Sequence, residues 1–208
     1  MSVADFVQLA GRSETVVSRS GFGEVEGLIG TALPDDYKAW AEAYPMIQIG
    51  GELVILNFST MERGELVAEL SHSLAGVERV LRAVPGGPLV SMDGKVIAPD
   101  SSTVSLRPEQ GGFLRWGLTE NNYALMWRLI GPPEAWPIVV TDAVDWWVYE
   151  GGFLEFITGL MSGVVECPFL SEEFYEWPAV AELQGYDVMD DGGCRPIFRL
   201  IGDWADEF

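Results

Sequence analysis

The sequence predicts a single α+β domain in which an antiparallel β-meander packs against helices. The chain has 208 residues, the size of one ordinary domain, and 48% of them are hydrophobic, which is enough to build a substantial core. From 113 to 149, short runs of apolar residues are separated by turns, as in neighbouring antiparallel strands. Elsewhere apolar residues recur every three or four positions, which is typical of helices.

The N-terminal part of the chain predicts helices. Residues 3–10 form a short amphipathic pattern, and a second short helix is expected from Phe22 to Gly30, where the glycine ends it. A third helix is expected to have Pro34 at its first position, where the missing N–H would be unpaired anyway, and to end at Pro45. Its buried face is predicted to consist of four apolar residues at helical spacing: Tyr37, Trp40, Ala41 and Tyr44.

The next part of the chain predicts short strands on both sides of a helical stretch. Strands are expected at Ile47–Ile49 and Leu53–Phe58, around a Gly-Gly turn. Leucine and valine residues then recur at helical spacing over 60–84, and two glycines in that stretch favour two shorter helices over one long helix. A further short strand is expected at Lys95–Ala98, within a region rich in proline, glycine and serine.

The clearest strand pattern begins at Phe113. Apolar residues alternate with other residues on both sides of Asn121-Asn122, and asparagine tolerates the positive φ that a tight hairpin turn requires. Two more strands are expected at Ile138–Thr141 and Trp146–Tyr149. A helix from 153 to 161, ended by Gly163, is expected to seal this antiparallel meander.

The last part of the chain is strongly acidic and still apolar enough to fold. From Asp142 to Phe208 there are 15 acidic residues and 2 basic ones, so this part carries −13 of the net charge of −20. Aromatic residues persist throughout it, whereas disordered acidic segments are poor in them. We therefore expect one domain over 1–208, with its core at about 17–163 and a folded acidic cover at 164–208.

The net charge restricts the classes of partner. A chain with 32 acidic residues against 12 basic ones repels nucleic acids and anionic membranes, so neither is expected as a partner. The negative charge favours a cationic protein as the partner, because complementary electrostatic fields accelerate the encounter of two proteins. An alternative explanation is that the charge serves solubility alone. The N-terminus lacks the pattern of a signal peptide, and no apolar run is long enough to cross a bilayer, so a cytoplasmic protein is expected.

The residue inventory argues against an enzyme, a metal site or a cofactor. His72 is the single histidine, and its surroundings lack a nucleophile motif, so we expect it at the surface. Cys167 and Cys194 lack the spacing of metal ligands, so free thiols are expected. The acidic turn around Asp190 differs in spacing from calcium loops. No catalytic residue, metal or cofactor is therefore predicted.

Two motifs resemble the SUKH superfamily, whose members include the yeast Smi/Knr cell-wall regulators and many bacterial immunity proteins. LPDDYKAWAEAYP at 33–45, followed by a glycine turn and a strand, is similar to the Leu-Pro-x-Asp-Tyr-Lys signature of the family's second helix. GGFLRWGLTENNYALMWRLIGPPEAWPIVVTD at 111–142, followed by GGFLEFITGLMSG at 151–163, is similar to the later half of actinobacterial members. The resemblance covers about 17–163 and implies a single domain with a twisted antiparallel sheet and packed helices.

The resemblance also implies a non-catalytic protein that binds another protein. In bacteria that partner is commonly a toxin domain, often a nuclease, which is neutralised in the producer's cytoplasm. Together with the charge, this predicts an immunity protein against a basic toxin, because toxins that bind phosphate carry Lys and Arg at their sites. The predicted contact residues are six acids of the C-terminal part: Glu172, Glu173, Glu176, Asp187, Asp190 and Asp191.

Two other functions stay open from the sequence. A cytoplasmic regulatory scaffold or adaptor of the Smi/Knr type would bind its partner through an apolar patch. An enzyme would need an acidic pair such as Glu172 and Glu173, and pairs are expected by chance in so acidic a chain. A neighbouring toxin gene would favour immunity, and an isolated gene would favour the adaptor. No oligomeric state is predicted.

Overall fold

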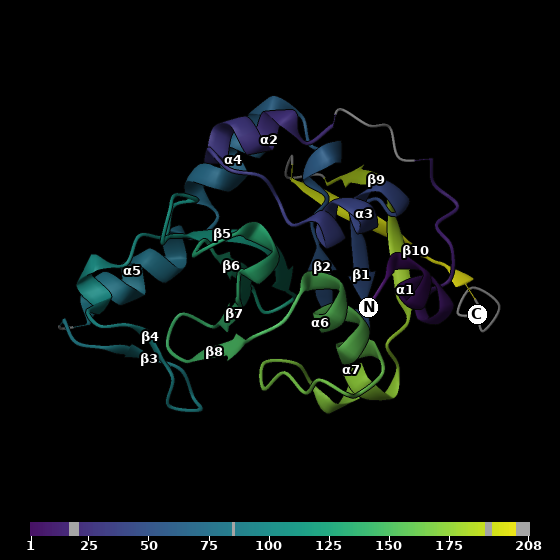
Figure 1. Ribbon diagram of the computed structural model, residues 1–208. Coiled ribbons are helices and arrows are strands. Elements are labelled where there is room, and N and C mark those ends of the chain that lie inside the picture. The colour runs from purple at the N-terminus through teal and green to yellow at the C-terminus, as the bar shows by residue number, and fades with distance from the viewer. Residues whose placement is uncertain (17–20, 85, 190–192, 203–208) are drawn as a thin grey trace.

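The computed structural model describes residues 1–16, 21–84, 86–189 and 193–202 and confirms the α+β class (Figure 1). The α-helices are α1 (Val3–Ala10), α2 (Gly23–Ile29), α3 (Asp35–Ala43), α4 (Arg63–His72), α5 (Ala75–Ala83), α6 (Phe153–Met161) and α7 (Glu172–Glu176), and short 3₁₀ turns lie at Phe58–Thr60, Ser101–Thr103 and Pro133–Ala135. The strands are β1 (Ile47–Ile49), β2 (Leu53–Ile55), β3 (Leu89–Val90), β4 (Val96–Ala98), β5 (Phe113–Thr119), β6 (Ala124–Arg128), β7 (Ile138–Thr141), β8 (Trp146–Tyr149), β9 (Val180–Val188) and β10 (Cys194–Leu200).

The main sheet has eight antiparallel strands in the order β10-β9-β1-β2-β5-β6-β7-β8. Strands β5 to β8 form the predicted meander, and Asn122 in the β5–β6 turn has a φ of 60°, as the turn requires. At the other end, β9 pairs with β1. The segment 164–208, which was expected to form a cover, therefore also supplies two strands of the sheet. Strand β9 occupies the edge of β1 that faces away from β2.

The principal core lies between the sheet and helices α1, α3 and α6 (Figure 1). The ring of Phe153 on α6 lies 5.1 Å from the ring of Trp116 on β5, measured between centroids. Phe6 of α1 and Val180 of β9 also belong to this hydrophobic core. The predicted face of α3 is confirmed, since four side chains are fully buried: Tyr37, Trp40, Ala41 and Tyr44.

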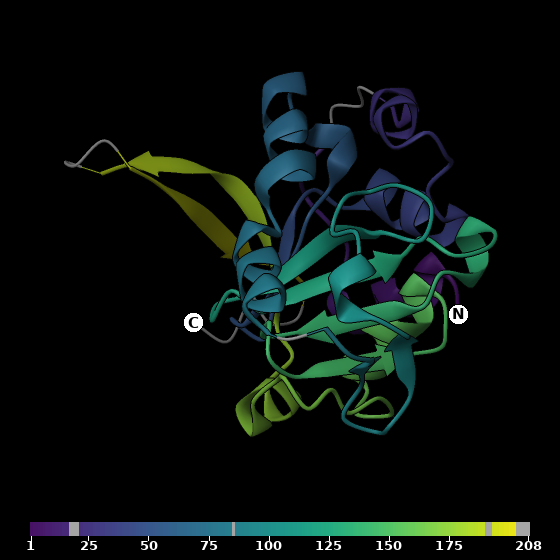
Figure 2. The ribbon, with the colours of Figure 1, turned by 90° about the vertical axis from the view of Figure 1, so that its left-hand side faces the viewer.

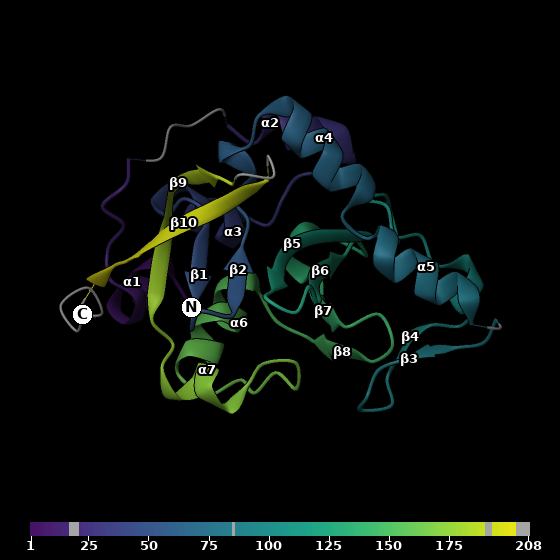
Figure 3. The ribbon, with the colours of Figure 1, turned by 180° about the vertical axis from the view of Figure 1, so that it is seen from behind.

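A smaller second core covers the opposite face of strands β5 to β8. Val77 and Leu81 of α5, together with Leu89 of β3 and Ile97 of β4, pack against this face (Figure 3). This packing explains the predicted helical stretch 60–84, whose helices are separate as expected and whose second helix forms part of this layer. It also explains why β7 is buried along its whole length, since both faces of the sheet are covered there.

Two of the element boundaries that differ from prediction have local explanations. Helix α3 begins at Asp35, and Pro34 is its N-cap, with a φ of −55° and a ψ of 136° that lie outside the helical region. Strand β2 ends at Ile55 because Asn57 turns the chain into a 3₁₀ turn: its Oδ1 accepts from the Ser59 N–H at 2.9 Å, and its Nδ2 donates to the Ala41 carbonyl at 2.7 Å. Over the described residues, no helix combines the length and the apolar character that a bilayer span requires.

Candidate protein-binding site

The structure separates the acidic residues that the sequence groups together. Glu172, Glu173 and Glu176 are exposed on α7. Asp187 instead lies near the far end of β9, where the β9–β10 hairpin projects beyond the other strands of the sheet (Figure 2). From the start of β9 to its end the chain spans about 25–30 Å at the rise of an extended strand. The Asp187 carboxylate also lies 3.9 Å from the guanidinium of Arg195 on β10. The three glutamates of α7 thus form one surface without Asp187.

The remaining predicted residues and reactive groups are placed as follows. Asp190 and Asp191 lie outside the described residues. His72 is exposed at the end of α4, as expected, and Cys167 and Cys194 are free thiols, the first buried and the second exposed. Within the described ranges, no group of three or more His, Cys, Asp and Glu residues is arranged to hold a metal ion.

Helix α7 is held in place by the β1–β2 turn. The Ser171 hydroxyl accepts from the Phe174 N–H at 3.2 Å and so caps the helix. The same hydroxyl donates to the Glu52 carboxylate at 2.8 Å, and the Ser171 N–H donates to that carboxylate at 3.1 Å. The ring of Phe174 lies against Gly50, where a Cβ atom would approach it to 2.7 Å. These contacts fix the direction in which the glutamates of α7 point.

Gly50→Ala is expected to lower the free energy of unfolding by about 2–3 kcal/mol, because the residue has a φ of 59° and its new methyl group would displace the Phe174 ring. Gly51→Ala is the matched control: its φ is 67°, but no atom lies within 4 Å of the added Cβ, so only about 1–2 kcal/mol of backbone strain is expected. Urea denaturation of both variants measures the difference. Equal losses would mean that the Gly50–Phe174 contact does not hold α7.

A groove beside α7 combines aromatic walls with carboxylates. We call it the β8–α7 groove, and its volume is about 580 Å³. Strand β8, the segment between α6 and α7, and α7 itself all contribute to it, at the lower end of the molecule in Figures 1 and 2. The residues that line it are Trp147, Glu166, Cys167, Pro168, Leu170, Glu172 and Tyr175.

The walls of the groove are held by packing and by backbone hydrogen bonds. The Trp147 ring lies 6.2 Å from the ring of Phe156 on α6, measured between centroids. The Tyr175 hydroxyl accepts from the Cys167 N–H at 2.6 Å, which ties α7 to the segment before it. That segment lies directly on α6, because a Cβ atom at Gly159 would be 2.5 Å from the Val165 Cγ2 atom. The groove is therefore built from fixed parts.

The charge of the groove comes from its carboxylates. The pKa of the Tyr175 hydroxyl is raised to about 12, chiefly by burial and to a smaller extent by the nearby Glu166 and Glu52 carboxylates. Burial also raises the pKa of the Cys167 thiol to about 12, so this thiol stays protonated at neutral pH and is a poor nucleophile. Glu166 and Glu172 supply negative charge, and no lining residue is basic. Across the described part of the chain, neither carboxylate forms an ion pair.

The buried Cys167 thiol predicts a loss of stability in alkali. In the unfolded chain the thiol ionises near its ordinary value of 9.0, whereas the folded protein holds the proton up to about 12. Between these pH values the unfolded state binds fewer protons than the native state, so the free energy of unfolding falls as the pH rises. Urea midpoints at pH 7, 9 and 10 measure this slope. Cys167→Ala should make the slope shallower, and an unchanged slope would contradict the assignment to Cys167.

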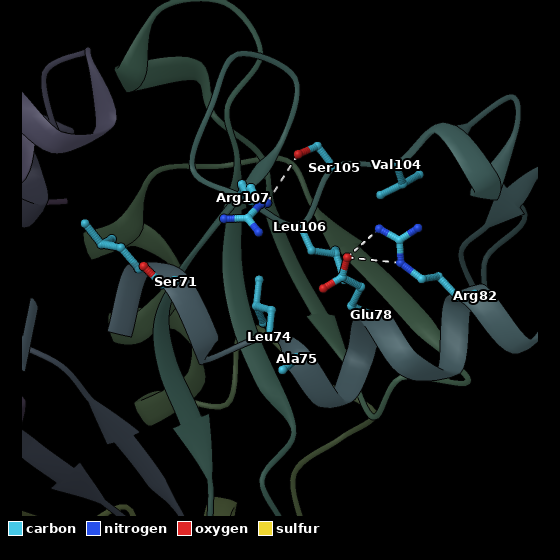
Figure 4. Close-up of a pocket in the computed structure, with 10 residues that line it drawn as sticks. Ser71, Leu74, Ala75, Glu78, Arg82, Val104, Ser105, Leu106 and Arg107 are labelled. Atoms are coloured by element: carbon cyan, nitrogen blue, oxygen red, sulfur yellow. Dashed lines mark hydrogen bonds and ion pairs between the residues drawn. The ribbon is translucent and has the colours of Figure 1, made fainter. Parts of the chain in front are cut away.

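A second, smaller pocket beside α5 contains two arginines, one of which is already paired. Its volume is about 70 Å³, and Glu78, Arg82 and Arg107 are among its lining residues (Figure 4). The Arg82 Nε donates to the Glu78 carboxylate at 3.0 Å, and Arg82 lowers the pKa of that carboxyl, with a smaller contribution from Arg107. Because Glu78 already occupies Arg82, Arg107 is the lining residue that is left to attract an anion.

Of the residues that line the groove, the sequence predicted Glu172 as a contact residue and missed the other six: Trp147, Glu166, Cys167, Pro168, Leu170 and Tyr175. The consecutive residues Trp146 and Trp147 on a strand do predict opposite faces of the sheet. Which of the two tryptophans lines an open groove depends on the path of the segment between α6 and α7, and the sequence of that segment has no periodic pattern that predicts its path.

Comparison of the chain with family models, curated proteins and solved structures gives no match.

Proposed function

We propose that this chain is a cytoplasmic, non-catalytic immunity protein that binds a basic bacterial toxin domain and neutralises it. The observation that carries the proposal is the β8–α7 groove, which has two carboxylates, aromatic walls and no basic lining residue. The net charge of −20 and the resemblance to the SUKH superfamily support the same function.

The acidic surface suits a toxin that acts on phosphate groups. Such a toxin, of which a nuclease is one class, needs Lys and Arg side chains at its active site. The exposed carboxylates of Glu172, Glu173 and Glu176 can occupy those side chains in place of phosphate. A protein with 32 acidic residues against 12 basic ones also attracts a cationic partner from a distance, so that association is fast at low salt.

A pull-down from the source cell tests this function. The tagged full chain is used as bait, and bound proteins are eluted with a rising salt gradient and identified. We expect a basic protein that elutes with salt, is toxic when expressed alone and is harmless when co-expressed with this chain. If the captured proteins are neutral or acidic and resist elution by salt, the proposal is wrong.

The projecting β9–β10 hairpin favours the scaffold or adaptor as the second candidate function. Tyr186 and Val188, two residues apart on β9 and therefore on one face of this hairpin, are 53% and 72% exposed, and exposed apolar side chains that lie together mark contact surfaces. An adaptor bound there would stay on the column in high salt and elute with mild detergent. Tyr186→Ser/Val188→Ser would abolish its capture, whereas capture of a basic toxin on α7 would be unaffected.

A further inference from the structure

We propose that the β8–α7 groove receives one arginine side chain of the partner protein. This inference rests on the proposed function, because it names the chemical group of a basic protein partner that the acidic surface would bind. It goes beyond a general attraction of charges, since it assigns one cationic side chain to one groove of about 580 Å³.

The charges of the groove call for a cation. Glu166 and Glu172 both line it, and the described residues include no lysine or arginine paired with either. The Glu52 carboxylate, which holds Ser171 at the start of α7, lies close enough to Tyr175 to raise the pKa of its hydroxyl. Two uncompensated carboxylates with a third nearby make this part of the surface suited to a single positive charge.

The aromatic walls favour arginine over lysine. A guanidinium is planar, stacks on aromatic faces and is weakly hydrated, whereas an ammonium group is a strongly hydrated point charge. Trp147 and Tyr175 supply the aromatic surface, and Glu166 and Glu172 supply carboxylates that can accept two parallel N–H bonds from a guanidinium. Arginine, tryptophan and tyrosine are also the residues that contribute most to binding at protein interfaces.

The groove is already formed in the free protein. The Tyr175 hydroxyl is tied to the backbone of Cys167 at 2.6 Å, and the segment after α6 lies against Gly159. Ser171 and Glu52 hold the start of α7 through two hydrogen bonds. Because these contacts exist without a ligand, the groove does not have to be built when the guanidinium binds, and the ordering that remains is that of the exposed Glu166 and Glu172 side chains.

Titration of the full chain with N-acetyl-arginine amide tests the inference. The indole N–H resonances of the tryptophans are followed by NMR, and Trp147→Phe identifies the Trp147 signal. We expect a saturable shift of this signal with a dissociation constant on the order of 1–10 mM, as suits one stacked and paired cation. N-acetyl-citrulline amide has the same shape without the charge and should cause no shift at matched ionic strength.

The matched variant is Glu166→Gln/Glu172→Gln, which keeps the shape of both side chains and removes their charge. It should weaken arginine binding at least about 10-fold while the rest of the NMR spectrum stays unchanged. N-acetyl-lysine amide should bind several-fold more weakly than the arginine amide. Equal shifts with citrulline or lysine, shifts confined to other tryptophans, or full affinity in the double variant would each overturn the inference.

The titration and the pull-down can fail independently of each other, because the titration uses a single amino acid derivative as its probe and involves no toxin. If the arginine amide fails to bind while the pull-down recovers a basic toxin, the inference is wrong and the proposed function stands. If the arginine amide binds in the groove while the pull-down recovers no basic protein, the groove is a guanidinium site and the immunity function is wrong.

Discussion

Phe153→Ala is expected to lower the free energy of unfolding by about 3–5 kcal/mol, the largest loss of stability that we predict for a single substitution. The side chain is 1% exposed at the start of α6. Its ring packs against four aromatic rings at centroid distances of 5.1 to 5.9 Å, those of Tyr37, Trp40, Trp116 and Trp127. Removing it leaves a cavity between α3, α6 and the sheet that these rigid rings cannot fill.

Urea denaturation measures this loss, and two controls bracket it. Phe153→Leu retains most of the volume and should lose about 1–1.5 kcal/mol or less. Val164→Ala removes a side chain that is 76% exposed and should change the free energy of unfolding by no more than about 0.5 kcal/mol. A loss below about 1 kcal/mol for Phe153→Ala would contradict the view that the aromatic cluster is the centre of the fold.

The double charge reversal Glu166→Lys/Glu172→Lys is expected to reduce the association rate constant with the basic partner by about 100-fold at low salt. Both residues line the β8–α7 groove, and the substitution replaces its two negative charges with two positive ones. A cationic partner would then be repelled where it should dock. Stopped-flow or surface-based kinetics with the protein recovered by the pull-down measures the effect.

Glu109→Lys/Glu134→Lys is the matched control, because it changes the net charge by the same amount at two exposed residues outside the groove. It should lower the association rate constant by no more than a few-fold, since a distant charge acts only through the screened field of the whole protein. Equal reductions in the two double variants would mean that total charge, and not the groove, determines binding.

The sequence predicts those parts of the fold whose signals are local. The helical spacing of Tyr37, Trp40 and Tyr44 identifies the buried face of α3, and the alternation around Asn122 identifies the β5–β6 hairpin. The pairing of β9 with β1 has no such signal, because the paired residues Ile47 and Glu182 lie far apart in the chain. Pairing at that distance depends on which edge the rest of the sheet leaves free.

The candidate site is less predictable than the fold for the same reason. The acidic composition identifies α7 as a charged surface, but it also groups Asp187 with Glu172, which the β9–β10 hairpin separates. Trp147 of β8 and Tyr175 of α7 both line the groove, and the contact of Phe174 with Gly50 sets the position of that helix. These are tertiary contacts, and no periodicity in the sequence encodes them.

The salt dependence of association between this chain and the protein that it captures tests the claim that an acidic surface recognises a basic partner. If an acidic surface recognises a basic partner, the association rate constant should fall steeply as the ionic strength rises, and Glu166→Lys/Glu172→Lys should flatten that dependence. A rate constant that stays the same across the salt series, in the unmodified chain and in the variant alike, would contradict the claim.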